Sequence, residues 1–419
     1  MKNSFSIFVI SLIIQLLFSI GISAQWINTN GPGGSFIQAL VVSRNNLFAG
    51  TYSGGVFIST NNGNNWNAVN SGLPNSPVRN FAVIDTNLFV GTSDGIYLST
   101  NNGVNWKSAG SGLLSKPILA LAAFGANLYA GTAGGGISFS TNNGKSWTDI
   151  SSNLPRIFIN PFYNYPHVNA IAVIGSNLFI GTEGYGVFMS TNNGTSWTEI
   201  NDGLPSIYVN SSRYVNSFAI VDKNLFIGTG NGGFFLWDKN NFRWNSVANV
   251  IKSTENMNKL VVDGKNIYAG TWGLYNNIFL STNYGTNWTD LSSGFFQTPI
   301  RSLVVNNEIL FAGTENYVFR RPLSEIATSM ELSESILYQN YPNPFNPTTT
   351  IRFSIPKLSF VILKIFDLLG REVTTFFNEE KKVGTYEIKF DGSLLSSGIY
   401  FYRLQAGNYS QTKKLMIIK

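Results

Sequence analysis

The sequence contains no cysteine and one histidine, and charged residues make up only 12% of its 419 positions. Without cysteine the chain has no disulfide framework, no Cys-ligated zinc and no thiol nucleophile. The single histidine, His167, excludes a His-clustered metal site and leaves one candidate for the base of a Ser-His triad. We therefore expect neither a metal site nor a cofactor, and we assign no catalytic residue.

Charge of either sign is sparse and scattered along the chain. The 28 Lys and Arg residues exceed the 22 Asp and Glu residues, but they are not bunched, so we do not expect a nucleic-acid ligand. The hydrophobic content of 43% and the aromatic content of 14% exclude a disordered chain. The length favours two or three domains, or one large repeat domain with an appendage.

After residue 24 no apolar run reaches the roughly 18 residues that a membrane-spanning helix needs. Residues 5–20 form one apolar run, preceded by Lys2 and followed by the small residues 21–24. This order is typical of a secretory signal peptide that is cleaved before Gln25. A membrane anchor is the alternative, and the polar residues within the run disfavour it. We predict a signal peptide at 1–24 and a secreted chain with no integral membrane segment after its removal.

Glycine, asparagine and aromatic residues are abundant, and they recur in a repeat of about 44 residues. The phrase Asn-Leu-Phe-x-Gly-Thr, or a close variant, occurs seven times. Its glycines are Gly50, Gly91, Gly131, Gly181, Gly228, Gly270 and Gly313. A second phrase, Ser-Thr-Asn-Asn-Gly-x-x-Trp, follows in five of the units, and residues 237–244 are a degenerate copy. Its key residues are Ser59, Asn61, Gly63 and Trp66; Ser99, Asn101, Gly103 and Trp106; Ser140, Asn142, Gly144 and Trp147; Ser190, Asn192, Gly194 and Trp197; and Ser281, Asn283, Gly285 and Trp288.

Each unit contains four short strand-like segments, with Asn-Asn-Gly supplying a tight turn between the third and fourth. Seven such units predict an all-β, seven-bladed β-propeller over residues 25–321. Residues 25–28 align with a fourth strand, whereas the last unit has only three strands. The N-terminal strand should therefore complete the last blade and close the ring. The repeated tryptophans should pack between neighbouring blades.

The second phrase resembles the Asp-box, or bacterial neuraminidase repeat, with asparagine in the place of aspartate. In that family the box is a folding motif at the blade periphery, away from the active centre. It occurs in sialidases, xyloglucan hydrolases, sortilin-like receptors and propellers similar to photosystem II assembly factors. The resemblance implies the propeller fold and says almost nothing about activity.

The composition changes after residue 321. Residues 322–335 have no strand period and are predicted to be a linker. Strand-like segments at 349–355, 361–367, 386–390 and 398–405 predict a small Ig-like β-sandwich over 336–419. This segment resembles the type A sorting domain of the type IX (Por) secretion system. The residues that carry the resemblance are Tyr341, Pro342, Asn343, Pro344, Phe345, Asn346, Pro347, Gly370, Arg371, Gly398, Tyr400, Lys414 and Lys419. It implies export, recognition by the type IX translocon and its sorting machinery, and a place outside the cell or on the outer-membrane surface. The alternative is an ordinary Ig-like binding module.

Two units of the propeller carry insertions, at 155–167 and 207–214, and insertions are tolerated where function resides. They should share one face with the loops between second and third strands. The candidate ligand-binding residues on that face are Tyr52, Asp94, Tyr163, His167, Glu183, Tyr185, Tyr208, Arg213, Trp272, Tyr275 and Glu315. Exposed aromatics with a few charges suit a glycan or a protein ligand.

We therefore expect a monomeric, exported binding or scaffold protein. An extracellular glycoside hydrolase, sialidase-like or xyloglucanase-like, is the alternative, because Asp94, Glu183 and Glu315 could supply the two carboxyl groups such enzymes need. The sialidase Arg-Ile-Pro signature is missing, and xyloglucan hydrolases use two propellers. A purely structural or assembly role also stays open.

Overall fold

The computed structural model describes residues 25–113, 117–159, 162–205, 213–230, 233–247, 256–273, 277–293, 295, 298–326, 335–356, 358–381, 384–407 and 409–419. One compact unit spans Gln25–Leu323, and a second contains the described residues from Ser324 to Lys419. The predicted signal peptide at 1–24 lies outside the described residues. No helix in the described ranges is long and apolar enough to cross a membrane.

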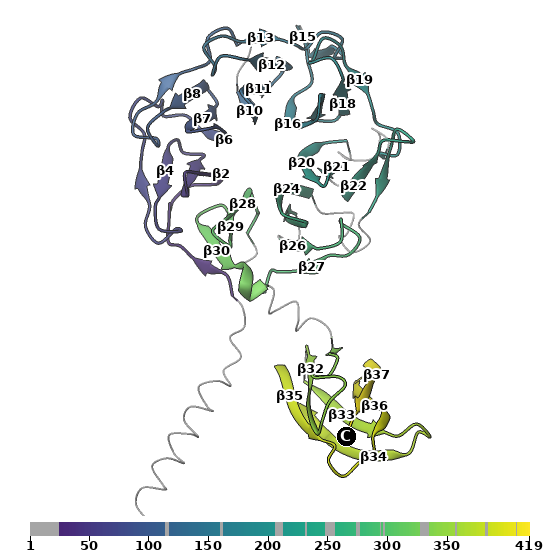
Figure 1. The fold of residues 1–419 in the computed structure, drawn as a ribbon. Helices are drawn as coiled ribbons and strands as arrows, with labels where there is room; N and C mark the ends of the chain where they lie inside the picture. Colours follow the sequence, from purple (N-terminus) through teal and green to yellow (C-terminus); the bar gives the residue numbers. More distant parts are fainter. Residues whose placement is uncertain are drawn as a thin grey trace, which may run out of the picture. The chain divides into compact units, whose positions relative to one another are not determined.

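Within its described residues, the first unit contains seven four-stranded antiparallel sheets arranged in a ring (Figure 1) and one two-stranded hairpin. The innermost strands are β2 (Ile37–Ser43), β6 (Val78–Ile84), β10 (Ile118–Phe124), β16 (Val168–Ile174), β20 (Val215–Val221), β24 (Asn256–Asp263) and β28 (Ser302–Asn306). The second strands are β3 (Asn46–Thr51), β7 (Asn87–Thr92), β11 (Asn127–Thr132), β17 (Asn177–Thr182), β21 (Asn224–Thr229), β25 (Asn266–Trp272) and β29 (Ile309–Gly313).

The two outer positions of each blade hold shorter strands. The third strands are β4 (Val56–Ser59), β8 (Gly95–Ser99), β12 (Ile137–Ser140), β18 (Gly186–Ser190), β22 (Gly233–Asp238), β26 (Ile278–Ser281) and β30 (Val318–Pro322). The outermost strands are β5 (Asn67–Ala68), β9 (Lys107–Ser108), β13 (Thr148–Asp149), β19 (Thr198–Glu199), β23 (Arg243–Ser246), β27 (Thr289–Asp290) and β1 (Ile27–Asn28). The predicted seven-bladed propeller is confirmed.

The first strand of the chain closes the ring, as predicted. Strand β1 pairs with β30 of the last blade, with Ile27 opposite Arg320 and Asn28 opposite Phe319. The last blade is therefore built from both ends of the unit, and its outer edge is paired rather than open.

The repeated tryptophans join each blade to the one before it. Five of them donate the indole N–H to a carbonyl oxygen of the neighbouring blade, at 2.7 or 2.8 Å. These bonds run from Trp26 to Leu291, Trp106 to Val69, Trp147 to Ala109, Trp197 to Ile150 and Trp244 to Ile200. Trp66 donates instead to the Thr29 hydroxyl at 3.3 Å, and Trp288 Nε1 has no partner among the described residues.

The turn that contains each repeated serine and asparagine is fixed by the same small network. In the first blade Ser59 Oγ donates to Asn61 Oδ1 at 3.1 Å and accepts from the Gly63 N–H at 2.8 Å. Asn61 Oδ1 also accepts from the Asn65 N–H at 2.9 Å. Because Asn62 and Gly63 both have positive φ, the fourth and fifth positions of the phrase favour asparagine and glycine.

The insertion at 155–167 contains a hairpin that the sequence did not predict. Strand β14 (Ile157–Ile159) pairs with β15 (Phe162–Asn164), and the predicted site residue Tyr163 lies opposite Phe158. The side chains of 158–163 are outside the described set.

The second unit is a sandwich of two sheets around one core. One sheet has the order β31 (Ile336–Leu337), β32 (Thr348–Ile355), β35 (Gly384–Asp391). The other has the order β34 (Glu372–Lys381), β33 (Ser359–Phe366), β36 (Gly398–Ala406), β37 (Tyr409–Ile417). Fully buried Phe353, Leu363 and Tyr402 lie in the core. The predicted sandwich is confirmed, but β34 and β37 were not predicted. Both are edge strands, and their exposed polar residues weaken the hydrophobic signal.

Candidate functional site

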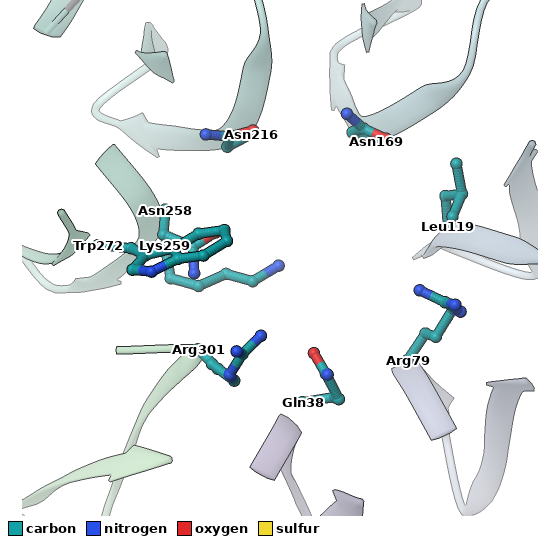
Figure 2. Close-up of a pocket in the computed structure, with 9 residues that line it drawn as sticks. All are labelled: Gln38, Arg79, Leu119, Asn169, Asn216, Asn258, Lys259, Trp272 and Arg301. Carbon is teal, nitrogen blue, oxygen red and sulfur yellow. The ribbon is translucent and has the colours of Figure 1, made fainter. Parts of the chain in front are cut away.

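The inner strands place one residue from each blade around the mouth of the central channel. These residues are Gln38, Arg79, Leu119, Asn169, Asn216, Asn258 and Arg301, and we call them the channel ring. Lys259 and Trp272 also line the opening, which has a volume of about 200 Å³ (Figure 2). The channel continues inward past the ring, where Ala39, Ala120 and Ala170 join the lining.

A β-bulge positions each ring residue in six of the seven inner strands. In β6, for example, Val78 pairs with Thr92 and Asn80 pairs with Gly91, so Arg79 between them has no partner in the ladder. The same shift occurs around Gln38, Leu119, Asn169, Asn216 and Asn258. Bulges commonly redirect a side chain near a functional site. Arg301, in the last blade, lies directly before its strand and donates its N–H to Gly313 O at 2.9 Å.

Two ring asparagines brace adjacent blades. Asn216 Nδ2 donates to Met257 O at 3.2 Å, and Asn258 Nδ2 donates to Ile300 O at 2.7 Å. Each bond reaches the residue just before the next ring position. The amide groups therefore fix the spacing of neighbouring ring residues.

The opening is positively charged. Arg79, Lys259 and Arg301 extend into it from three sides (Figure 2). No Asp or Glu is among its lining residues in the described part of the chain. Burial lowers the pKa of Lys259, because the ammonium loses hydration and gains no carboxylate partner there. The three cations repel one another, and Lys259 also loses hydration. An anion in the opening would offset both of these unfavourable contributions.

Arg301 is held in an aromatic setting. Its guanidinium lies 4.4 Å from the Phe36 ring centroid and 5.5 Å from that of Trp272. Phe36 in turn contacts Tyr52, with 5.8 Å between ring centroids. Arg301 Nη2 pairs with Glu315 Oε1 at 3.3 Å, and its buried Nε has no partner in the described ranges. Three of the predicted site residues, Tyr52, Trp272 and Glu315, are thus gathered around one ring arginine.

Arg79 is oriented differently. Its Nε donates to Ser93 Oγ at 3.1 Å, in the loop that also carries the predicted residue Asp94. The Thr92 hydroxyl caps the turn that carries Asp94, because Thr92 Oγ1 accepts from the Asp94 N–H at 3.0 Å. Burial raises the pKa of Tyr97, and the charge of Asp94 adds to that effect.

Other predicted residues form separate pairs on the same side of the blades. No partner of His167 could be named from the sequence, but its Nδ1 lies 3.0 Å from Glu183 Oε2, with both side chains about two-fifths exposed. Arg213 lies 3.7 Å from Glu199 and donates to Pro205 O, and the Tyr185 carbonyl accepts from Asn201. None of these four predicted residues lines the opening. Tyr208 and Tyr275 lie outside the described residues.

The ring itself was not predicted from the sequence, although a signal for it exists. Every ring residue lies twelve positions before the repeated glycine of its blade, as Gln38 does before Gly50 and Arg301 before Gly313. This position of the repeat varies in polarity, whereas the residue before it is apolar in all seven blades and the residue after it is Ala or Ser except at Asn80 and Lys259. Lys259 follows the ring position directly.

The described residues contain no group of three or more His, Cys, Asp or Glu side chains able to hold a metal ion. The predicted carboxylates Glu183 and Glu315 are each engaged by a basic side chain.

Residues 339–419 match the family model of the secretion system C-terminal sorting domain. This segment is a type IX sorting domain. It implies export to the cell surface or the extracellular space and interaction with the type IX secretion machinery, as the sequence resemblance predicted. Residues 37–237 match the model of the DUF6242 beta propeller domain. No curated protein matches the sequence of the chain.

Solved structures share the propeller fold at low sequence identity. YCF48 from Cyanidioschyzon merolae is 14% identical, with a TM-score of 0.53, over 72% of this chain and 99% of that protein. PorZ, a surface component of the type IX secretion system of Porphyromonas gingivalis, is 15% identical, with a TM-score of 0.52, over 93% of this chain and 60% of PorZ. The GH74 xyloglucanase of Xanthomonas campestris is 15% identical, with a TM-score of 0.57, over 79% of this chain and 59% of the enzyme. These likenesses concern the fold.

Proposed function

We propose that the propeller of this exported protein binds an acidic glycan, a chain that bears carboxylate groups, at the mouth of its central channel. The observation that carries the proposal is the convergence of Arg79, Lys259 and Arg301 on one opening whose described lining has no carboxylate. Arginine forks and a lysine ammonium are the usual protein partners of carboxylate groups.

The surroundings of the opening favour a sugar as the carrier of the acidic group. Trp272 and Tyr52 are each nearly half exposed, and Phe36 is more than a third exposed beside them. Such rings can stack on the apolar face of a pyranose. The volume of about 200 Å³ is below that of most small-molecule pockets, roughly 300–1,000 Å³. It therefore suits one acidic sugar unit, with the rest of the chain lying across the aromatic loops.

Hydrolysis is the weaker candidate. A glycosidase of the common type needs two carboxyl groups that flank the scissile bond. The lining of the opening supplies none within the described ranges, and the predicted acid Glu315 is paired with Arg301. A peptide is the other ligand class to test, because the similar propeller YCF48 has been solved bound to D1 peptide.

The test is a binding titration of the mature chain, residues 25–419, with oligogalacturonate, with neutral xyloglucan oligosaccharides and with poly-glutamate. We expect oligogalacturonate to bind best, and we expect the Arg79→Gln/Arg301→Gln variant to bind at least ten-fold more weakly. Lys107→Gln, which removes a cation from the exposed outer strand β9, is the control and should bind as the wild type does.

Each other outcome has a definite meaning. Equal binding of neutral oligosaccharides, or binding that the double variant leaves unchanged, would refute the proposal. A preference for poly-glutamate would replace the glycan by an acidic peptide. Release of reducing ends from any of the sugars would make the protein a hydrolase.

A further inference from the structure

The strand order of the sorting domain brings four separate segments to one end of the sandwich, which we call the motif end. The segments are 345–347, 367–371, 392–397 and 417–419. Gly392 N–H donates to Pro347 O at 2.8 Å, Ile418 N–H to Phe345 O at 3.0 Å, and Lys419 N–H to Ser397 Oγ at 3.0 Å. The turn 367–371 belongs to this end because β33 ends where Phe366 pairs with Phe401, near the start of β36.

The motif end exposes aliphatic side chains that the fold does not use. Leu368 and Leu369 are 65% and 78% exposed, and Leu394 is 97% exposed. The adjacent residue Leu395 packs against the core. The same connection therefore buries one leucine and leaves the other, Leu394, in water. Ile418, half exposed, lies in the same region. Several exposed aliphatic residues at one place are typical of a protein-binding surface.

The turn that carries Leu368 and Leu369 is held rigid. Asp367 Oδ1 accepts from the N–H groups of Leu369 and Arg371, both at 2.9 Å, and Oδ2 accepts from Arg371 Nε at 2.6 Å. Desolvation raises the pKa of Asp367, but the hydrogen bonds from Arg371 and Leu369 outweigh it and the net pKa is lowered. The carboxylate is therefore ionised at neutral pH and keeps the turn closed.

The connection that carries Leu394 is also held by hydrogen bonds to an aspartate. Asp391 Oδ1 accepts from the Ser393 N–H at 2.8 Å, and Lys419 Nζ donates to Ser393 O at 2.8 Å. Both leucine-bearing segments are thus ordered before any partner arrives. Preordered contact residues lose less conformational entropy on binding.

We propose that the motif end is the surface by which the type IX machinery recognises this chain, with Leu368, Leu369 and Leu394 entering an apolar pocket of a protein of that machinery. A sorting domain acts by being recognised by a protein partner. The motif residues at this end of the sandwich are Pro347, Arg371, Gly398 and Lys419. The partner's pocket is apolar because the exposed anchors are aliphatic.

The domain supplies its own control. Leu358 is 62% exposed, like Leu368, but it precedes β33 and therefore lies at the opposite end of the sandwich. A loss of hydrophobicity there should not matter for recognition.

The experiment expresses the full chain in a bacterium with an active type IX system and measures the fraction found outside the cell against the fraction retained in the periplasm. Leu368→Ser/Leu369→Ser should reduce the exported fraction at least ten-fold, and Leu394→Ser at least three-fold. Leu358→Ser should be exported as the wild type is. Leu368→Met/Leu369→Met, which keeps the end apolar, should restore at least half of the export.

Folding is checked separately by thermal unfolding of each purified mature chain, and the serine variants should unfold at the wild-type temperature because their side chains are in water. Normal export of both serine variants would overturn the proposal, and so would an equal loss for Leu358→Ser. A serine variant that is exported normally but loses self-association on gel filtration would show that the motif end joins copies of this chain, which would also overturn it.

Discussion

At the rim of the propeller, the second and fourth blades make the same contacts. Ser99 and Asn101 repeat the hydrogen bond of Ser190 and Asn192, at 3.0 and 2.8 Å. At the axis the same two blades present different side chains, Arg79 and Asn169. Positions that repeat in every blade are those that any blade needs in order to fold and pack. A position that varies between blades is free to serve a ligand, and the channel ring is that position.

The largest effect is expected from substituting a repeated glycine of the second strand, because this position repeats in all the blades. A Cβ on Gly131 would lie 2.6 Å from Val168 O and 2.7 Å from Val168 Cγ1 of the next blade. Because a backbone atom is in the way, Gly131→Ala should cost about 3 kcal/mol of unfolding free energy, measured by denaturant titration.

Gly33 provides the control for that experiment. It is exposed, and the nearest atom to its added Cβ is Tyr317 Cε1 at 3.4 Å. Gly33→Ala should change the unfolding free energy by no more than about 0.5 kcal/mol. Equal effects of the two substitutions would show that the repeated glycine has no special packing role.

A second test concerns the bond between blades. Trp197→Phe removes the donor to Ile150 O, which is 2.7 Å away, and should cost about 2 kcal/mol. Trp288→Phe removes a donor that has no partner in the described part of the chain, so it should cost about 1 kcal/mol less. Identical losses in denaturant titrations would mean that packing, and not the hydrogen bond, links the blades.

Removing the charge of Lys259 at the channel mouth should stabilise the fold, whereas the substitutions above should destabilise it. Burial lowers the pKa of Lys259 in the folded chain, so the unfolded chain binds the proton more tightly. The charge therefore destabilises the fold in full below the folded pKa, and this penalty fades as the pH rises toward the ordinary value of 10.5. Lys259→Gln should raise the melting temperature at neutral pH by several degrees, and the gain should shrink in alkaline buffer. A gain that does not vary with pH would contradict the account.

The smallest effect is expected where the rim departs from the Asp-box pattern. Asn61 Oδ1 accepts two hydrogen bonds, and a carboxylate there would accept them more strongly. Asn61→Asp should stabilise the protein by about 0.5 kcal/mol at neutral pH. The hydrogen bonds should lower the carboxyl pKa in the fold, so the gain should be lost as the pH falls through that lowered value.

Asn64→Asp, in the exposed part of the same turn, is the matched control for this substitution and should have no such pH-dependent gain. If Asn61→Asp destabilises the fold, the asparagine is required for a reason that the turn network does not contain.

The fold was predictable because its signals are local and repeated. The Asn-Gly turns, the strand phrases and the tryptophans lie within a few residues of one another in each unit, and seven copies reinforce them. The edge strands β34 and β37 were missed because many of their side chains are exposed and polar. The channel ring was missed for a different reason: Arg79 and Arg301 are far apart in the sequence, and only closure of the ring brings them together. Trp272 was predicted because its loop position and its aromatic ring are both visible in one unit.

The central claim, that the ligand occupies the channel mouth, is tested most directly by labelling of Lys259. An amine-specific acylating reagent is applied to the free protein, and the labelling rates of Lys259 at the channel mouth and of the exposed Lys107 are quantified by mass spectrometry. Saturating oligogalacturonate should protect Lys259 and leave the labelling of Lys107 unchanged. Labelling of Lys259 that continues at its free rate while the glycan is bound would contradict the account.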